Sequence, residues 1–166
     1  MAFEAPVAEM LRTIAGTGGL EPAVLGGTVS ADTLAAILTE AGRFAAKELA
    51  PLNAVGDREG VRLADGQGTT APGWRDAYRR FAEGGWSGIS APEAWGGQGL
   101  PVVVEMACQD LWNAGSAAFA TGPMLTASGI LALEAHASDA LKQTYLPKLA
   151  SGEWMATMNL TEPQAG

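Results

Sequence analysis

The segment Met158-Asn-Leu-Thr-Glu-Pro-Gln-Ala-Gly166 bears most directly on the fold, because it reads as the start of a ligand-binding layer. The preceding residues Glu153–Leu160 predict a strand, and Pro163 then turns the chain because it fixes its own φ and holds Glu162 extended. Gly166 permits a backbone conformation that a side chain would forbid. A strand that brings a threonine hydroxyl, backbone amides and a glycine together can cradle a planar or phosphorylated ligand. An ordinary strand-ending turn is the alternative interpretation.

The residues before this segment predict a series of helices. Apolar residues recur there at spacings of three and four, as on one face of a helix. Helices are expected after Pro6 to about residue 15, from the N-cap Ser30 to a break at Pro51, from Trp74 to Gly84, from Pro101 onward, over Met124–Ala135, and from Ser138 to Leu146, where Pro147 should interrupt the last one. The stretch 55–72 is rich in glycine and predicts turns.

Helices followed by one strand predict an all-α domain and the beginning of a separate β-domain. A lone strand is not stable without a partner, so we expect the chain to be a fragment of a longer protein. The expected divisions are an N-terminal extension (1–29), a helical domain (30–152) and the truncated start of a β-domain (153–166).

Composition narrows the class of protein. The 166 residues are 48% hydrophobic and 17% charged, which is typical of a globular domain with a core. The formal charge of -8 disfavours nonspecific nucleic-acid binding, which needs positive surface. With one cysteine, Cys108, and one histidine, His136, the chain has no internal disulfide and predicts no zinc site.

The sequence carries no visible targeting or membrane signal. Glu4 and Glu9 lie where a secretory signal would be basic and then apolar. No apolar stretch looks long enough to span a bilayer, so we expect a cytoplasmic protein without a membrane span. Gly96-Gly97-Gln98-Gly99 lacks the lysine and the βαβ context of phosphate-binding loops, which favours a tight turn between helices.

Two segments resemble the acyl-CoA dehydrogenase family. Met158–Gly166 resembles its flavin-binding signature, in which Thr-Glu-Pro-x-Ala-Gly is followed by Ser-Asp. The segment Ser90-Ala-Pro-Glu-Ala-Trp-Gly-Gly-Gln-Gly-Leu-Pro101 is similar to the Pro-Glu-x-x-Gly-Gly-x-Gly turn that precedes the acyl-pocket helices of these enzymes. Tyr145–Glu153 resembles the lead-in to the family's strand, and Phe3–Arg12 resembles the extension of a subgroup that includes 3-methylmercaptopropionyl-CoA dehydrogenases.

The resemblance implies FAD as cofactor and assigns roles to particular residues. It places Met158 beside the flavin, backbone contacts at Leu160 and a hydroxyl from Thr161 near the N1–C2 carbonyl edge, where donors stabilise the reduced ring. Gly166 would lie near the acyl thioester and the cofactor. Three further residues, Phe119, Ala120 and Pro123, fall where the family lines its distal acyl pocket, with ordinary core packing as the alternative.

The resemblance also implies a reaction and partners. An intact enzyme of this family oxidises an acyl-CoA to a trans-2-enoyl-CoA with a glutamate base, passes electrons to an electron-transfer flavoprotein and is commonly a homo-oligomer. The family places that glutamate in a C-terminal domain, so we expect no catalytic base in these 166 residues and no activity from them alone. An acyl-CoA oxidase or nitroalkane oxidase, a non-catalytic helical interaction module and an alkylation-response flavoprotein remain as alternatives.

Overall fold

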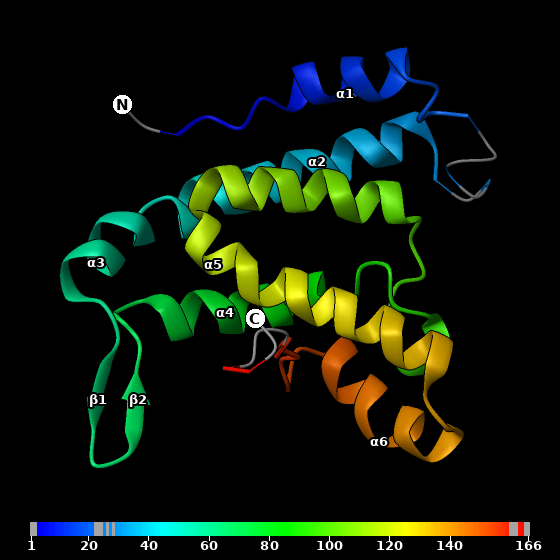
Figure 1. Cartoon of the computed structure of the whole chain (residues 1–166). Coiled ribbons are helices and arrows are strands. Elements are labelled where there is room, and N and C mark those ends of the chain that lie inside the picture. Colours follow the sequence, from blue (N-terminus) through cyan, green and yellow to red (C-terminus); the bar gives the residue numbers. More distant parts are fainter. Residues whose placement is uncertain (1–2, 22–24, 26, 28, 160–162, 165–166) are drawn as a thin grey trace.

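The computed structural model of the chain describes residues 3–21, 25, 27, 29–159 and 163–164, and they are mostly helical. This confirms the all-α class (Figure 1). The elements follow in the order α1 (Val7–Gly16), α2 (Ala31–Phe44), the π-helical turn η1 (Ala45–Leu49), α3 (Leu52–Glu59), β1 (Arg62–Ala64), β2 (Gln67–Thr69), α4 (Trp74–Glu83), the 3₁₀ turns η2 (Trp86–Gly88) and η3 (Glu93–Trp95), α5 (Val102–His136) and α6 (Asp139–Ala150).

Helix α2 begins where the sequence predicts. The hydroxyl of Ser30 accepts a hydrogen bond from the backbone N–H of Thr33 at 3.0 Å, which satisfies one free donor of the first turn. The helix buries Leu34, Leu38 and Ala41 and packs against α5. The predicted break at Pro51 is also confirmed, because α2 widens into η1 and α3 then starts as a new helix.

Helix α5 covers both of the helices expected between residues 101 and 135. Ser116 interrupts it with non-helical φ and ψ angles of -158° and 98°. At this point α5 lies so close to η1 that a Cβ on Gly115 would be 3.0 Å from the carbonyl oxygen of Ala45. The side-chain amide of Asn53 donates to the carbonyl oxygen of Gly115 at 2.7 Å. A close helix contact and a side chain bonded to the backbone therefore hold the kink.

The length of α5 bears on the expectation that the chain has no membrane span. Within the described residues it is the one helix long and apolar enough to cross a membrane by length and composition, and a third of the relevant window is buried. Core helices of globular domains meet the same criterion. Here α5 packs against α2, η1 and α6, and Figure 1 shows that it folds back at its kink, so that the first half lies beside α2 and the second half runs toward α6.

The core has one large cluster and one small one. The large cluster surrounds Phe81, Trp112 and Phe119 and joins α2, α4 and α5. The small one, around Ile130 and Leu146, joins the second half of α5 to α6. Because α5 contributes to both clusters, it fixes α4 and α6 in relation to each other.

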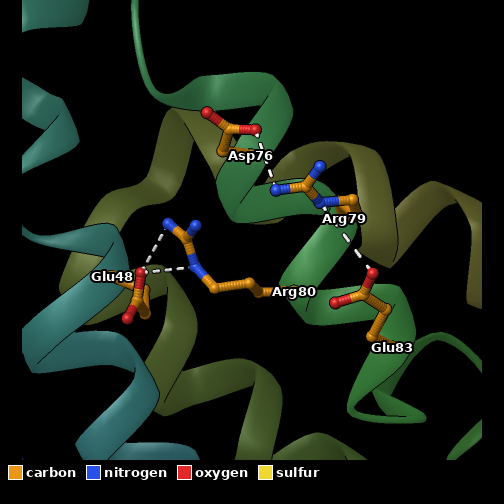
Figure 2. A network of polar contacts seen from close by, with 5 residues as sticks. All are labelled: Glu48, Asp76, Arg79, Arg80 and Glu83. Carbon is orange, nitrogen blue, oxygen red and sulfur yellow. Dashed lines mark hydrogen bonds and ion pairs between the residues drawn. The ribbon is translucent and has the colours of Figure 1, made fainter.

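Ion pairs link the outer faces of η1 and α4 (Figure 2). The guanidinium of Arg80 contacts the Glu48 carboxylate through two nitrogens, at 2.7 and 2.8 Å. Arg79 pairs with Asp76 and Glu83 along α4 itself. All these side chains are at least partly exposed, so each ion pair contributes at most about 1 kcal/mol to the free energy of unfolding.

Three local expectations differ from the structure. The strand predicted over Glu153–Leu160 is not formed in its described residues, 153–159, which lack regular structure; the two strands in the described part of the chain pair with each other instead. The stretch expected to be only turns contains the antiparallel hairpin β1–β2, closed by Asp65-Gly66 with positive φ at both residues. Helix α6 continues through Pro147 to Ala150.

Candidate functional site

The segment 153–159, called the C-terminal segment below, contacts the second half of α5 through Met155 and Ala156. The backbone N–H of Ala156 donates to the Thr126 hydroxyl at 3.2 Å. Small residues allow this approach, since a Cβ on Gly129 would be 2.6 Å from the Cβ of Ala156. A Cβ on Gly122 would likewise collide with the end of the Met155 side chain. Gly122, Thr126 and Gly129 therefore form a shallow track for the segment.

Contacts from α4 and α6 hold the start of the segment. The Tyr78 hydroxyl donates to the carbonyl oxygen of Gly152 at 3.1 Å, and the backbone N–H of Trp154 donates to the carbonyl oxygen of Lys148 at 3.0 Å. The Lys148 ammonium lies 4.2 Å from the centre of the Trp154 ring and 3.1 Å from the Glu153 carboxylate. Three helices thus fix where residues 152–156 leave the bundle.

A pocket of about 320 Å³, called the inner pocket below, lies beside this segment. It is bounded by the end of the hairpin, the first turns of α4, the middle of α5 and Met155. Its wall consists of Gly68, Thr70, Trp74, Arg75, Tyr78, Ala118, Phe119, Gly122, Pro123 and Met155. The lining is mostly apolar, as in pockets that hold hydrophobic ligands. No carboxylate lines it among the residues that the structure describes.

Aromatic rings pack closely on one side of the inner pocket. The Phe119 ring is 6% exposed and lies 5.8 Å from the ring of Phe81, 6.1 Å from Trp74 and 6.5 Å from Tyr78, measured between centroids. Tilted and edge-to-face rings at these distances attract each other and resist rotation. Phe119 is therefore both a core residue and part of the pocket wall.

The turn at residues 88–101 places the start of α5. The backbone N–H groups of Gly99 and Leu100 donate to the carbonyl oxygens of Ala91 and Ile89 at 2.9 and 3.0 Å. A side chain on Gly97 would collide with Ala91. These backbone contacts confirm a tight structural turn.

At the start of α5, the buried carboxylate of Glu105 accepts a short hydrogen bond from the Ser90 hydroxyl and a longer one from Gln109. Burial, together with the Glu105 charge, raises the pKa of the nearby Cys108 thiol to about 12. The thiol is therefore protonated at neutral pH and unsuited to nucleophilic chemistry.

Comparison with known proteins gives the family. Residues 31–153 match the family described as acyl-CoA dehydrogenase, N-terminal domain. The chain belongs to the acyl-CoA dehydrogenase family. This domain is 40% identical over its whole length to a 3-methylmercaptopropionyl-CoA dehydrogenase of Ruegeria pomeroyi, of which it covers 29%. It is 32% identical over 71% of its length to a butyryl-CoA dehydrogenase of Syntrophomonas wolfei, of which 20% is covered.

A glutaryl-CoA dehydrogenase of Desulfococcus multivorans is 29% identical over 56% of the chain, and 25% of that relative is covered. The acyl-CoA dehydrogenase chain described here thus spans less than a third of the length of these curated relatives. The family resemblance in the sequence is confirmed. The similarity to a 3-methylmercaptopropionyl-CoA dehydrogenase agrees with the subgroup that the N-terminal residues indicated. Each of these relatives is named as a dehydrogenase.

The residues predicted for the acyl pocket of this acyl-CoA dehydrogenase domain lie together. Phe119 and Pro123 line the inner pocket, and Ala120, which is 2% exposed, is buried beside them. Their contact with a substrate stays a prediction. The sequence did not indicate Tyr78, which α4 brings against Phe119, or Met155, which reaches the pocket through the docking of the C-terminal segment.

The residues predicted for the flavin are described only in part. Met158 is 57% exposed on the C-terminal segment, while Leu160, Thr161 and Gly166 lie outside the described residues. Met155 is also exposed, at 49%. Two large apolar side chains at the surface of one short segment are suited to be covered by another apolar group.

Proposed function

We propose that the chain is the N-terminal part of an FAD-dependent acyl-CoA dehydrogenase that oxidises the α,β bond of an acyl-CoA thioester to a trans-2-enoyl-CoA. The observation that carries this proposal is the inner pocket: an apolar cavity of about 320 Å³ beside the segment that leads to the predicted flavin contacts. The family match and the names of the relatives support the reaction type.

The inner pocket is suited to an acyl chain. Phe119, Pro123 and Met155 offer apolar contacts, and the aromatic cluster behind Phe119 keeps the wall in place. Such a wall excludes water from the carbon that must lose a proton, which makes a carboxylate a stronger base. Because no carboxylate lines the pocket in the described part of the chain, we assign the base to another part of the full-length protein.

The described residues are compatible with FAD beside the C-terminal segment. The exposed thioether side chains of Met155 and Met158 offer an apolar surface to a ring system, and Thr161 would add a hydroxyl donor. When bound, FAD supplies the acceptor for the hydride that leaves the β-carbon. The role of this chain is to hold the segment in place through Thr126, Tyr78 and Lys148.

The wider setting follows from this proposal. The enzyme takes part in fatty-acid or related acyl-CoA metabolism, transfers its electrons to an electron-transfer flavoprotein, assembles as a homo-oligomer and lies in the cytoplasm. It binds no nucleic acid, in keeping with its formal charge of -8. Helix α5 is a core helix and does not span a membrane, in keeping with its packing against α2 and α6.

The test is an assay of the full-length protein. We expect it to retain flavin, to lose the oxidised-flavin absorbance when an acyl-CoA is added without oxygen, and to yield the enoyl-CoA by mass spectrometry. Hydrogen peroxide produced in step with substrate loss would indicate the oxidase alternative instead. A full-length protein that binds no flavin and oxidises no acyl-CoA would contradict the proposal. The 166 residues alone serve as a control in which no oxidation is expected.

A further inference from the structure

A second cavity adjoins the inner pocket. This outer pocket has a volume of about 480 Å³ and lies between α3, the base of the hairpin, the start of α4 and the middle of α5. Gly56, Val61 and Ala71 belong to it alone. Thr70, Trp74 and Ala118 line both pockets, so the two share one wall.

The Trp74 indole fills the space between the two pockets. On the inner side its ring lies 6.1 Å from that of Phe119. On the outer side it presses on α3, where a Cβ on Gly56 would be 2.8 Å from Cζ2 of the indole. The buried indole nitrogen has no hydrogen-bond partner among the described residues. Replacing Trp74 with an apolar residue therefore removes volume and no hydrogen bond found in the described part of the chain.

We propose that the outer pocket is a distal compartment of the acyl site and that Trp74 closes it, which sets the longest acyl chain the enzyme accepts. The inference rests on the proposed function. The occupant is the uncharged end of an acyl chain, because Val61, Ala71 and Ala118 offer apolar contacts. The exposed carboxylate of Asp57, also part of the lining, disfavours an anionic end.

The experiment compares acyl-CoA thioesters of increasing length on the full-length enzyme, by kcat/KM and by calorimetric affinity. Trp74→Leu removes most of the side chain that separates the two pockets. We expect the ratio of kcat/KM for a long over a short acyl chain to rise about tenfold, since each added methylene in a pocket contributes on that scale. Trp74→Phe removes less volume and should give a smaller shift. Trp95→Leu is the control, because Trp95 lines neither pocket, and its length profile should stay as in the wild type.

A double variant distinguishes opening of the outer pocket from a wider loss of packing around Trp74. Val61 lines that pocket and is 74% exposed, so Val61→Trp can fill the space with little strain on the core. Trp74→Leu combined with Val61→Trp should return the length profile to that of the wild type. A shift that persists in the double variant, or active Trp74 variants with unchanged profiles in rate and affinity, would overturn the inference. A wild-type enzyme that oxidises no acyl-CoA would instead overturn the proposed function, while the affinity profiles still report on the pocket.

Discussion

The backbone N–H of Ala156 donates to the hydroxyl of Thr126 across 3.2 Å, between residues thirty positions apart. The same hydroxyl donates to the carbonyl oxygen of Gly122 within α5, so both of its hydrogen-bonding roles are used. Thr126 is 2% exposed, which shields the bond from water. This contact ties the C-terminal segment to the helix that also forms the wall of the inner pocket.

Replacing Thr126 tests that tie. Thr126→Val keeps the shape of the side chain but removes the acceptor for the Ala156 N–H, which should weaken docking of the segment by about 0.5–1.5 kcal/mol. Hydrogen exchange of the full-length protein should then be faster in residues 153–159. Thr126→Ser keeps the hydroxyl and should exchange like the wild type. Equal protection in the valine and serine variants would show that the bond does not hold the segment.

The two glycines of the track make a matched pair. The higher helix propensity of alanine should by itself raise the free energy of unfolding by about 1 kcal/mol in each of the variants Gly122→Ala and Gly129→Ala. At Gly122 the obstacle is the flexible end of Met155, which can rotate away, whereas at Gly129 it is the Cβ of Ala156, which is fixed to the backbone at 2.6 Å. We therefore expect Gly129→Ala to be less stable than Gly122→Ala by about 1–3 kcal/mol. Thermal unfolding of the full-length variants measures the difference, and equal midpoints would contradict it.

The sequence predicted the helices well because periodicity and end signals agree there. The Ser30 cap, the Pro51 break and the Gly84 end of α4 are local features, and each is confirmed. The sequence also predicts two separate helices within α5, but it does not place the break at Ser116, because that position depends on contacts with Asn53 and η1, which no local pattern reveals.

Two other differences have separate causes. The hairpin did carry a local signal, the Asp65-Gly66 turn, which was read as a turn without its strands. For the site, the family motif indicated Phe119 and Pro123, but no pattern could show that Met155 reaches the same pocket. That position depends on the docking of the C-terminal segment onto α5.

Phe119 should limit acyl length from inside the inner pocket. Phe119→Ala would extend the accepted chain but, as a buried aromatic truncation, should cost about 3–5 kcal/mol of stability. Phe119→Leu opens less space at a smaller cost and should shift the length profile in the same direction. Phe44→Leu is the control, since Phe44 is also buried but lies outside the pocket. Steady-state kinetics on a series of acyl-CoA lengths gives the profile, and profiles unchanged in both Phe119 variants would count against this role.

The buried thiol of Cys108 predicts a loss of stability at alkaline pH. Burial and the Glu105 charge raise its pKa from an ordinary value of 9.0 to about 12, so the folded state holds the proton more tightly than the unfolded state. The resulting stabilisation is complete below pH 9 and is lost as pH rises through 12. Burial raises the pKa of Tyr78 as well, and its contribution falls with rising pH in the same sense.

The variant Cys108→Ala distinguishes the contribution of the Cys108 thiol to this pH dependence from that of Tyr78, because it removes the thiol and leaves the tyrosine. Denaturant midpoints of the wild type should fall more steeply than those of Cys108→Ala as the pH is raised above 9. In the same range, an alkylating reagent should label Cys108 only after unfolding, since the protonated, buried thiol is a poor nucleophile. Rapid alkylation of the folded protein near pH 9, with parallel stability curves for the two proteins, would show that the thiol titrates normally.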